Sequence, residues 1–108
     1  MLSPENEKKL YGMIGLAARA RRIITGVELI NTDLRGKRTV KLVLVASDAS
    51  ENSKKRTVNC CRYYNTEYIE NAVKKGDAAH AVGKPGEISA IAICDDGFAS
   101  AIKKIILQ

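Results

Sequence analysis

The stretch that decides the fold is KLVLVASDASE, residues 41–51. It contains a continuous apolar run, residues 42–46, that is too short for a helix and rich in β-branched side chains. Such a run is typical of a strand that is buried on both faces of a sheet. Asp48 and Glu51 follow with the spacing of a capping box, which predicts a helix that begins there and continues to about Tyr64.

The alternation of strands and helices continues toward the C-terminus. We expect a short strand at residues 67–69, a helix at about 75–82 that ends at Gly83, and a second buried strand at residues 88–93. Asp95 or Asp96 is expected to cap a last helix. The apolar residues on the core face of that helix are Phe98, Ile102, Ile105 and Ile106.

Two helices are predicted before the central strand. Ser3 and Pro4 form a helix start, with serine as the N-cap and proline at the first helical position. The apolar residues that follow recur at helical spacing until residues 23–26 interrupt the period, where a second helix begins that ends at Gly36. Helices that alternate with strands predict an α/β fold, a three-layer α/β/α sandwich.

Length and composition indicate one globular domain, residues 1–108. Apolar residues make up 45% of the chain, enough for a core without a metal or disulfide bridges. The sequence has neither an apolar run of membrane-spanning length nor the start of a signal peptide. Three cysteines cannot form a fully paired disulfide framework. We therefore expect a cytoplasmic, monomeric protein with no cofactor and no membrane partner.

Basic residues are concentrated in the N-terminal part of the chain. The formal net charge is +6, and residues 1–46 carry +5 of it. Two basic clusters flank the second predicted helix: Arg19, Arg21 and Arg22 before it, and Arg35, Lys37, Arg38 and Lys41 after it. A guanidinium group can bind a phosphate with two hydrogen bonds, so this asymmetry favours a polyanionic partner.

The side chains that could carry catalysis or bind a metal have simpler structural explanations. Neighbouring residues on a helix point about 100° apart, so at most one of Cys60 and Cys61 faces the core. Cys94 has no second cysteine at zinc-site spacing, and His80 has no nucleophile assigned by spacing. The sequence also has no glycine-rich nucleotide-binding loop. These residues predict neither an enzyme nor a metal site nor a small-molecule substrate.

Several stretches resemble bacterial YlxQ-like proteins, which belong to the L7Ae/L30e family of ribosomal proteins. The two longest are GLAARARRIITG, residues 15–26, and KLVLVASDASEN, residues 41–52. Shorter ones follow in the same order at residues 63–65, 81–83, 90–93 and 96–99, so the resemblance covers nearly the whole chain. It implies an α/β/α sandwich with a small mixed sheet, binding of kink-turn RNA, and no catalysis.

The resemblance also implies where RNA binds. The family grips RNA at the N-terminus of the second helix through the pattern Gly-x-Asn-Glu-x-x-Lys, where free backbone N–H groups suit phosphate. In this chain Gly26 and Val27 begin that stretch, Glu28 stands in place of Asn, Leu29 in place of Glu, and Thr32 in place of Lys. A carboxylate can still accept hydrogen bonds from guanine, whereas leucine cannot read a base edge.

The family's second contact is a loop after the fourth helix, whose apolar side chains pack on an extruded base. The matching segment is residues 83–87, and Gly83 fits the pattern. Lys84 is expected to contact phosphate and Pro85 to stack under a base, while Glu87 would repel the RNA backbone.

Together these observations predict a non-catalytic, ribosome-associated protein that binds structured, kink-turn-like RNA, with ribosomal RNA as the target. The expected RNA-binding residues are Gly26, Val27, Glu28, Arg19, Arg21, Arg22, Arg35, Lys37, Arg38, Gly83, Lys84 and Pro85. The alternative is a protein–protein adaptor that uses the same basic face to hold an acidic partner.

Overall fold

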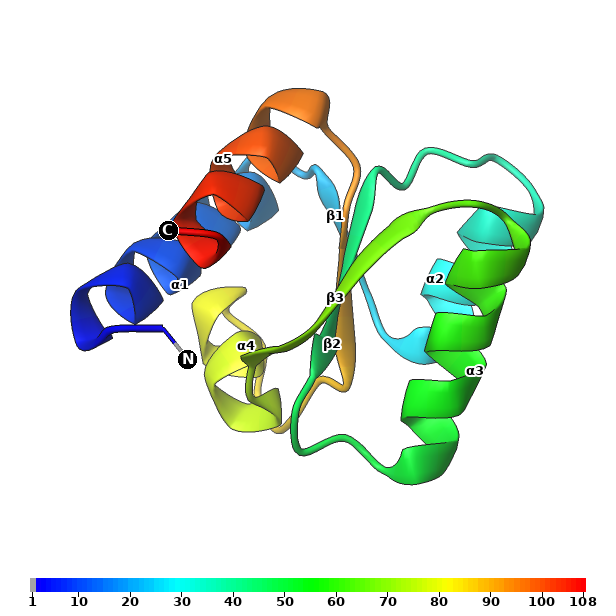
Figure 1. The fold of residues 1–108 in the computed structure, drawn as a ribbon, viewed down its shortest axis with the longest axis horizontal. Helices are drawn as coiled ribbons and strands as arrows, with labels where there is room; N and C mark the ends of the chain where they lie inside the picture. Colours follow the sequence, from blue (N-terminus) through cyan, green and yellow to red (C-terminus); the bar gives the residue numbers. More distant parts are fainter. Residues whose placement is uncertain (1) are drawn as a thin grey trace.

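The central strand of the fold is β2 (Leu42–Ala46), which is buried along its whole length. The structure is a computed structural model that describes residues 2–108 (Figure 1). Within this range one four-stranded sheet has the order β1-β4-β2-β3. The strand β4 (Ala90–Ile93) pairs antiparallel with β1 (Ile23–Thr25) and with β2, and β3 (Glu67–Val73) pairs parallel with β2. The sheet is therefore mixed.

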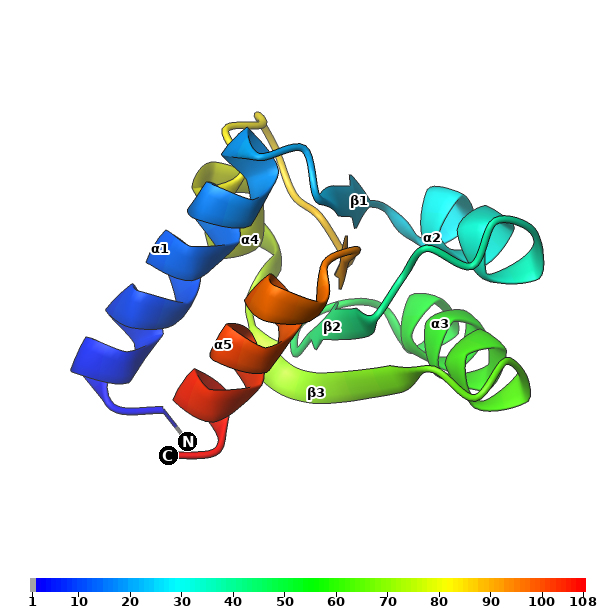
Figure 2. The same cartoon turned by 90° about the horizontal axis from the view of Figure 1, so that it is seen from above.

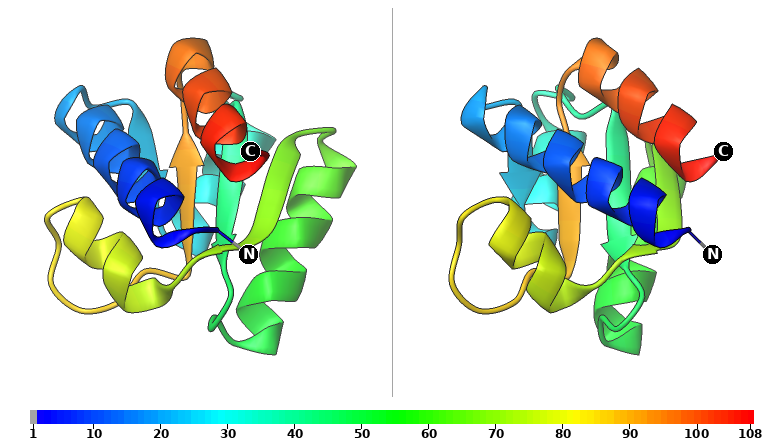
Figure 3. Two further views of the ribbon diagram at one scale, coloured as in Figure 1. Left: turned by 60° about the vertical axis from the view of Figure 1, so that its left-hand side comes forward. Right: turned by 90° about the vertical axis from the view of Figure 1, so that its left-hand side faces the viewer.

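Helices cover both faces of this sheet (Figure 2). One face carries α1 (Pro4–Arg19), α4 (Lys75–Ala81) and α5 (Asp96–Ile106), and the other carries α2 (Val27–Arg35) and α3 (Glu51–Tyr63). On the first face α1 lies between α4 and α5 (Figure 3). The predicted three-layer α/β/α sandwich is confirmed.

Two apolar cores form because successive side chains of a strand point to opposite faces. Leu42 and Leu44 of β2 pack with Leu10 and Ile14 of α1, with the buried residues of α4 and α5 in the same cluster. On the other face Val43 and Val45 pack with Ile30 and Leu34 of α2 and with Cys61 of α3. Within residues 2–108 no helix is both long and apolar enough to cross a bilayer.

The helix caps agree with the sequence at two helices and differ at a third. Ser3 Oγ accepts a hydrogen bond from the Asn6 N–H at the start of α1, and an Asp95 carboxylate oxygen accepts one from the Phe98 N–H at the start of α5. The predicted capping box at Asp48 is wrong, because α3 begins two residues later than that pattern requires, with Ser50 as its N-cap. Ser50 Oγ accepts from the Ser53 N–H.

Strand lengths differ from the sequence prediction in three places. The sequence pattern indicates only a break between helices at residues 23–25, yet these residues form β1 and pair with β4 at the sheet edge. β3 is longer than predicted and ends at Val73, with a register shift that leaves Asn71 in a left-handed conformation (φ 66°). β4 is shorter and begins at Ala90.

Candidate nucleic-acid interface

The turn between β1 and α2 places a helix N-terminus at the edge strand of the sheet. Gly26 adopts φ 95° and ψ 141°, a conformation that disfavours residues with a Cβ atom. Its N–H donates to the Ala90 carbonyl oxygen at 3.1 Å, which fixes the start of α2 against β4. No side chain of residues 2–108 caps this helix. The amides of its first turn, which have no partner within a helix, are therefore available to an anion.

The loop after α4 lies against this helix start. Lys84 Nζ donates a hydrogen bond to Thr25 Oγ1 at 2.8 Å, so the loop is held to the last residue of β1. An open groove of about 530 Å³ is lined by Gly26, Val27 and Glu28 at the start of α2 and by residues 87–89 before β4. The structure thus brings together two of the predicted RNA-binding segments, residues 26–28 and the loop beginning at Gly83, which are nearly 60 residues apart in sequence.

Both carboxylates that line this groove have cationic partners. Glu28 forms an ion pair with Arg56 of α3. Glu87, which was expected to repel an RNA backbone, lies 3.5 Å from Lys75 Nζ. The two pairs offset the negative charge beside the free amides of α2. Sequence reasoning missed Arg56, because Glu28 and Arg56 are on different helices and no local pattern links them.

Arg21 is held beside β1 by the end of α1. Its N–H donates to the Ala18 carbonyl oxygen at 3.0 Å, the next N–H donates to Ala17, and Arg21 adopts φ 59°. This is the position after a helix at which glycine is the usual residue. The Arg21 side chain lines a second groove, of about 380 Å³, together with Leu29 and Lys84. Arg19 lines a neighbouring groove with Gly83.

The remaining basic residues form a separate group at the C-terminal end of α2. Arg35, Lys37 and Arg38 end or follow this nine-residue helix, which is about 13 Å long. Arg38 lies over the ring of Tyr64 at 5.1 Å, and all three side chains are exposed. The structure therefore places basic residues at both ends of one helix, and it does not bring Arg35, Lys37 and Arg38 to Gly26.

Arg22 belongs with this second group, although it follows Arg21 directly. Its carbonyl oxygen accepts from the Cys94 N–H at 2.8 Å, at the end of β4 that is far from Ala90. Burial raises the pKa of Cys94, and the nearby charges of Arg22 and Lys41 act in the opposite direction. The loop that leads to Lys41 is held by Asp33, which accepts hydrogen bonds from the N–H groups of residues 39 and 40 at 2.9 and 3.1 Å.

The cysteines of this chain are not activated. Burial raises the pKa of Cys61 to about 12, and burial also raises the pKa of Cys60 and of Cys94. These thiols stay protonated near neutral pH, whereas a thiolate is the nucleophile and the metal ligand. Cys61 is fully buried, and Cys60 is partly buried against the same core cluster, so both cysteines contact the core and only Cys61 lies within it. Residues 2–108 contain no group of three potential ligands that could hold a metal.

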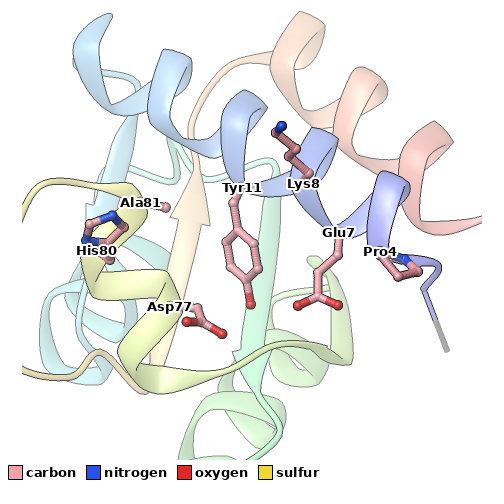
Figure 4. A pocket seen from close by; sticks show the side chains of 7 residues that line it. All are labelled: Pro4, Glu7, Lys8, Tyr11, Asp77, His80 and Ala81. Carbon is pink, nitrogen blue, oxygen red and sulfur yellow. The ribbon is translucent and has the colours of Figure 1, made fainter.

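His80 lines a different groove, between α1 and α4 (Figure 4). The side chains of Glu7, Tyr11 and Asp77 also point into this space (Figure 4). Burial raises the pKa of Tyr11, as do the charges of Asp77 and Glu7, so this phenol is a poor proton donor near neutral pH. The lining residues include no serine, threonine or cysteine that His80 could activate.

Comparisons of the sequence identify relatives over nearly the whole chain. The model of the "Ribosomal protein L7Ae/L30e/S12e/Gadd45 family" matches residues 8–103. A protein of Enterococcus faecium named "RNA-binding protein YlxQ" is 39% identical over 101 residues, which cover 94% of each chain. A protein of the same name from Bacillus subtilis (strain 168) is 31% identical over 96 residues, covering 89% of this chain and 93% of the relative.

Solved structures share the fold. A protein with unknown function from Bacillus halodurans C superposes with a TM-score of 0.84 at 30% identity, covering 93% of this chain and 98% of the other. The Giardia lamblia 15.5kD RNA binding protein gives a TM-score of 0.74 at 15% identity, with coverage of 98% and 88%, a likeness in fold alone. With a family match across residues 8–103, the chain is a YlxQ-like member of the ribosomal protein L7Ae/L30e/S12e/Gadd45 family.

Proposed function

We propose that this protein binds structured RNA, without catalysis, at what we call the α2 N-terminal site: residues 26–28, the loop 83–85, Arg19 and Arg21. The observation that carries the proposal is the hydrogen bond from Lys84 to Thr25, which holds a basic loop against an uncapped helix start. Free amides, a helix dipole and nearby cations together suit phosphate. The two sequence relatives are named as RNA-binding proteins, in line with this proposal.

Kink-turn RNA is the structured RNA that we propose as the target. The motif departs from the family pattern at residues 28, 29 and 32. Because threonine stands at residue 32 in place of lysine, α2 has one cation fewer than the pattern. Arg56, which Glu28 holds beside the first turn of α2, supplies a cation on the neighbouring helix instead. In this proposal Arg56 contacts a phosphate, and Glu28 positions Arg56 and has a smaller part in reading guanine.

The second basic group, Arg22, Arg35, Lys37 and Arg38, is proposed to bind a further stretch of RNA backbone. Arg35, Lys37 and Arg38 are separated from Gly26 by the length of α2, about 13 Å, and Arg22 is separated from it by β1. An RNA that follows α2 could therefore contact both ends of the helix. We further propose that the RNA is ribosomal, that the protein acts as a monomer in the cytoplasm, and that it is recovered with ribosomes. Co-sedimentation with purified ribosomal subunits tests that association.

The experiment that tests the function compares two RNAs at two salt concentrations. We expect a kink-turn RNA with tandem G·A pairs to bind at least about tenfold more tightly than a duplex of equal length, a difference of about 1.4 kcal/mol. We expect that preference to persist at the higher salt. Equal affinities that fall together as salt rises would contradict kink-turn specificity and leave charge as the only source of binding.

Point variants locate the binding surface. Arg21→Ala removes one proposed phosphate contact, so the slope of log affinity against log salt should become shallower by about one. Lys104→Ala is the matched control, because Lys104 is an exposed cation on α5. If both variants change the slope equally, the α2 N-terminal site is not the binding surface. Weak RNA binding, together with an acidic protein that binds more tightly and displaces the RNA, would favour the adaptor alternative.

A further inference from the structure

The loop that joins α2 to β2, residues 36–41, is held in one conformation by Asp33. The Asp33 side chain is buried, with its residue only 7% exposed. Its Oδ1 accepts hydrogen bonds from the N–H groups of Thr39 and Val40, and its Oδ2 accepts one from the Thr39 hydroxyl. The main-chain carbonyl oxygen of Asp33 also accepts from the Arg38 N–H at 2.7 Å. Because hydrogen bonds to a carboxylate are stronger than neutral ones, this loop presents its cations from a fixed backbone.

Arg38 stands at the point where this loop meets the end of α3. It adopts φ 54°, a left-handed conformation that residues with a Cβ atom rarely adopt and that is concentrated at functional sites. The carbon of its guanidinium group lies 5.1 Å from the centroid of the Tyr64 ring. Figure 1 shows the end of α3 beside the loop that follows α2. The loop therefore carries a cation that is stacked on an aromatic ring at the molecular surface.

Tyr63, the last residue of α3, has an aromatic ring that the core does not use. It is 81% exposed, in a chain with only four tyrosines and one phenylalanine. Tyr64 next to it packs against the core cluster of α2 and α3. The centroids of the two rings are 4.9 Å apart and their planes are inclined by 74°. Such an edge-to-face pair supports the Tyr63 ring from one side and leaves most of its surface open to solvent.

The surroundings of the two rings are strongly basic. Residues 33–41 and 59–66 together contain one acidic side chain, Asp33, whose oxygens are occupied by the loop. A ring exposed among cations is typical of proteins that bind single-stranded nucleic acid, because a base stacks on the ring while its phosphates bind the cations. The same two segments contain five basic side chains, all exposed: Arg35, Lys37, Arg38, Lys41 and Arg62.

We propose that the Tyr63 face, formed by Tyr63, Tyr64, Lys37 and Arg38, binds an unpaired strand of the RNA. A base stacks on Tyr63, and Lys37 and Arg38 bind the phosphates beside it. This inference rests on the proposed RNA-binding function and names the ligand of the second basic group as a single strand, whose bases are free to stack, and not a duplex. The Tyr63 face lies at the C-terminal ends of α2 and α3, and the length of α2 separates its loop from Gly26.

The chemistry of the Tyr63 face also predicts its selectivity. Every base has a π face, so a tyrosine ring stacks with any of the four, and lysine and arginine bind phosphates regardless of sequence. We therefore expect the face to distinguish an unpaired strand from a duplex and to have little preference among bases. An acidic protein would be attracted by the cations alone and does not require an exposed ring, so the ring favours RNA as the occupant.

The test adds a single strand to the RNA and then removes its bases. Kink-turn RNA is compared in three forms: without a tail, with a tail of about eight uridines at either end, and with a tail of as many abasic residues. For wild type we expect the uridine tail to give an affinity at least about fivefold above that of the abasic tail, in the range of stacking contacts.

Matched variants separate the ring from the charge. Tyr63→Leu should lose the gain from the uridine bases, and Tyr63→Phe should keep it because phenylalanine retains the ring. Both should bind the RNA without a tail as wild type does. Lys37→Ala should weaken binding of both tailed RNAs alike, and Lys104→Ala, which removes an exposed cation of α5, should not. Thermal unfolding verifies that the Tyr63 variants fold, as expected for a side chain this exposed.

The outcomes keep this inference separate from the proposed function. If the uridine and abasic tails bind wild type equally, or if Tyr63→Leu keeps the gain, the Tyr63 face is wrong, and a preference for kink-turn RNA over duplex still supports the proposed function. If the tail adds affinity that depends on Tyr63 but the kink-turn RNA binds no better than a duplex, kink-turn binding is wrong and the Tyr63 face stands. An oligoglutamate peptide that binds wild type more tightly than the uridine tail does, and that loses this binding in Tyr63→Leu, would assign the face to an acidic protein and overturn the proposal.

Discussion

The conformation of Arg21 gives a prediction in which stability and RNA binding change in opposite directions. Arg21 follows the C-terminal residue of α1 in a left-handed conformation, φ 59°, where residues with a Cβ atom are disfavoured by roughly 1–2 kcal/mol. Glycine relieves that cost but has about 0.5–1 kcal/mol more conformational entropy to lose on folding. The difference predicts that Arg21→Gly stabilises the fold by roughly 0.5–1 kcal/mol.

Arg21→Ala separates the backbone effect from the charge. Alanine keeps the Cβ atom and therefore the strained conformation, so its unfolding free energy should stay within about 0.5 kcal/mol of wild type. For a domain of this size the glycine variant should melt about 3–6 °C higher than the alanine variant. Both variants lack the guanidinium, so both should lose the same RNA affinity, with a salt slope shallower by about one.

The assay is thermal unfolding together with a salt titration of RNA binding, performed on wild type, the two Arg21 variants and Lys104→Ala. Equal melting temperatures of the glycine and alanine variants would refute the strain assigned to φ 59°. A wild-type salt slope in both variants would refute the phosphate contact. A more stable variant that binds RNA less well would mean that an arginine at this turn lowers stability and raises RNA affinity.

Three further predictions concern the neighbouring side chains. If Glu28 positions Arg56, Glu28→Ala should weaken RNA binding by the otherwise wild-type protein but not by the Arg56→Ala variant. A double-mutant cycle of RNA affinities measures this coupling, and stronger RNA binding by Glu28→Ala would mean that the carboxylate only repels RNA. Asp33→Ala removes the acceptor of several hydrogen bonds and should lower the unfolding free energy by about 2–4 kcal/mol in urea titrations, and a loss under 1 kcal/mol would contradict that role. The hydrogen bond from the Lys75 N–H lowers the pKa of Asp48 in the folded state. The stabilisation by the ionised Asp48 is therefore present above the unfolded pKa of about 3.9 and is lost as the pH falls through the lower folded pKa. The melting-temperature difference between wild type and Asp48→Ala should shrink as the pH falls, and a constant difference from pH 6 to 2.5 would contradict this prediction.

The sequence was sufficient for elements whose signal is local. The apolar run of β2 and the helical spacing of the apolar residues predicted the central strand and the layers on both faces. β1 was missed because three residues carry no measurable period, and its partner β4 lies about 70 residues later. Asp48 and Ser50 are both good N-cap residues. The Asp48 carboxylate accepts a hydrogen bond from the N–H of Lys75, 27 residues later, and Ser50 is the N-cap of α3 instead.

The candidate site was predictable in its residue types and only partly in its grouping. Arg21 and Arg22 are adjacent, and the sequence placed them in one cluster. The left-handed turn at Arg21 sends the chain into β1, so Arg21 lines the groove with Lys84 while Arg22 lies beside Cys94. The two adjacent arginines therefore have different neighbours, and no pattern of residue types reveals the left-handed turn between α1 and β1.

The pairing of charges around α2 explains how a helix start with a glutamate can still attract phosphate. An unpaired Glu28 would interact favourably with the helix dipole and would compete with an anionic ligand for the same free amides. Its ion pair with Arg56 is largely solvated, with side-chain exposures of 71% and 46%, and such pairs contribute only about 0–1 kcal/mol to stability. The pair is therefore weak enough for Arg56 to turn toward a phosphate when RNA arrives. Its main effect is then electrostatic: it keeps a cation within reach of the groove and offsets the carboxylate, at a helix that lacks the lysine expected at residue 32.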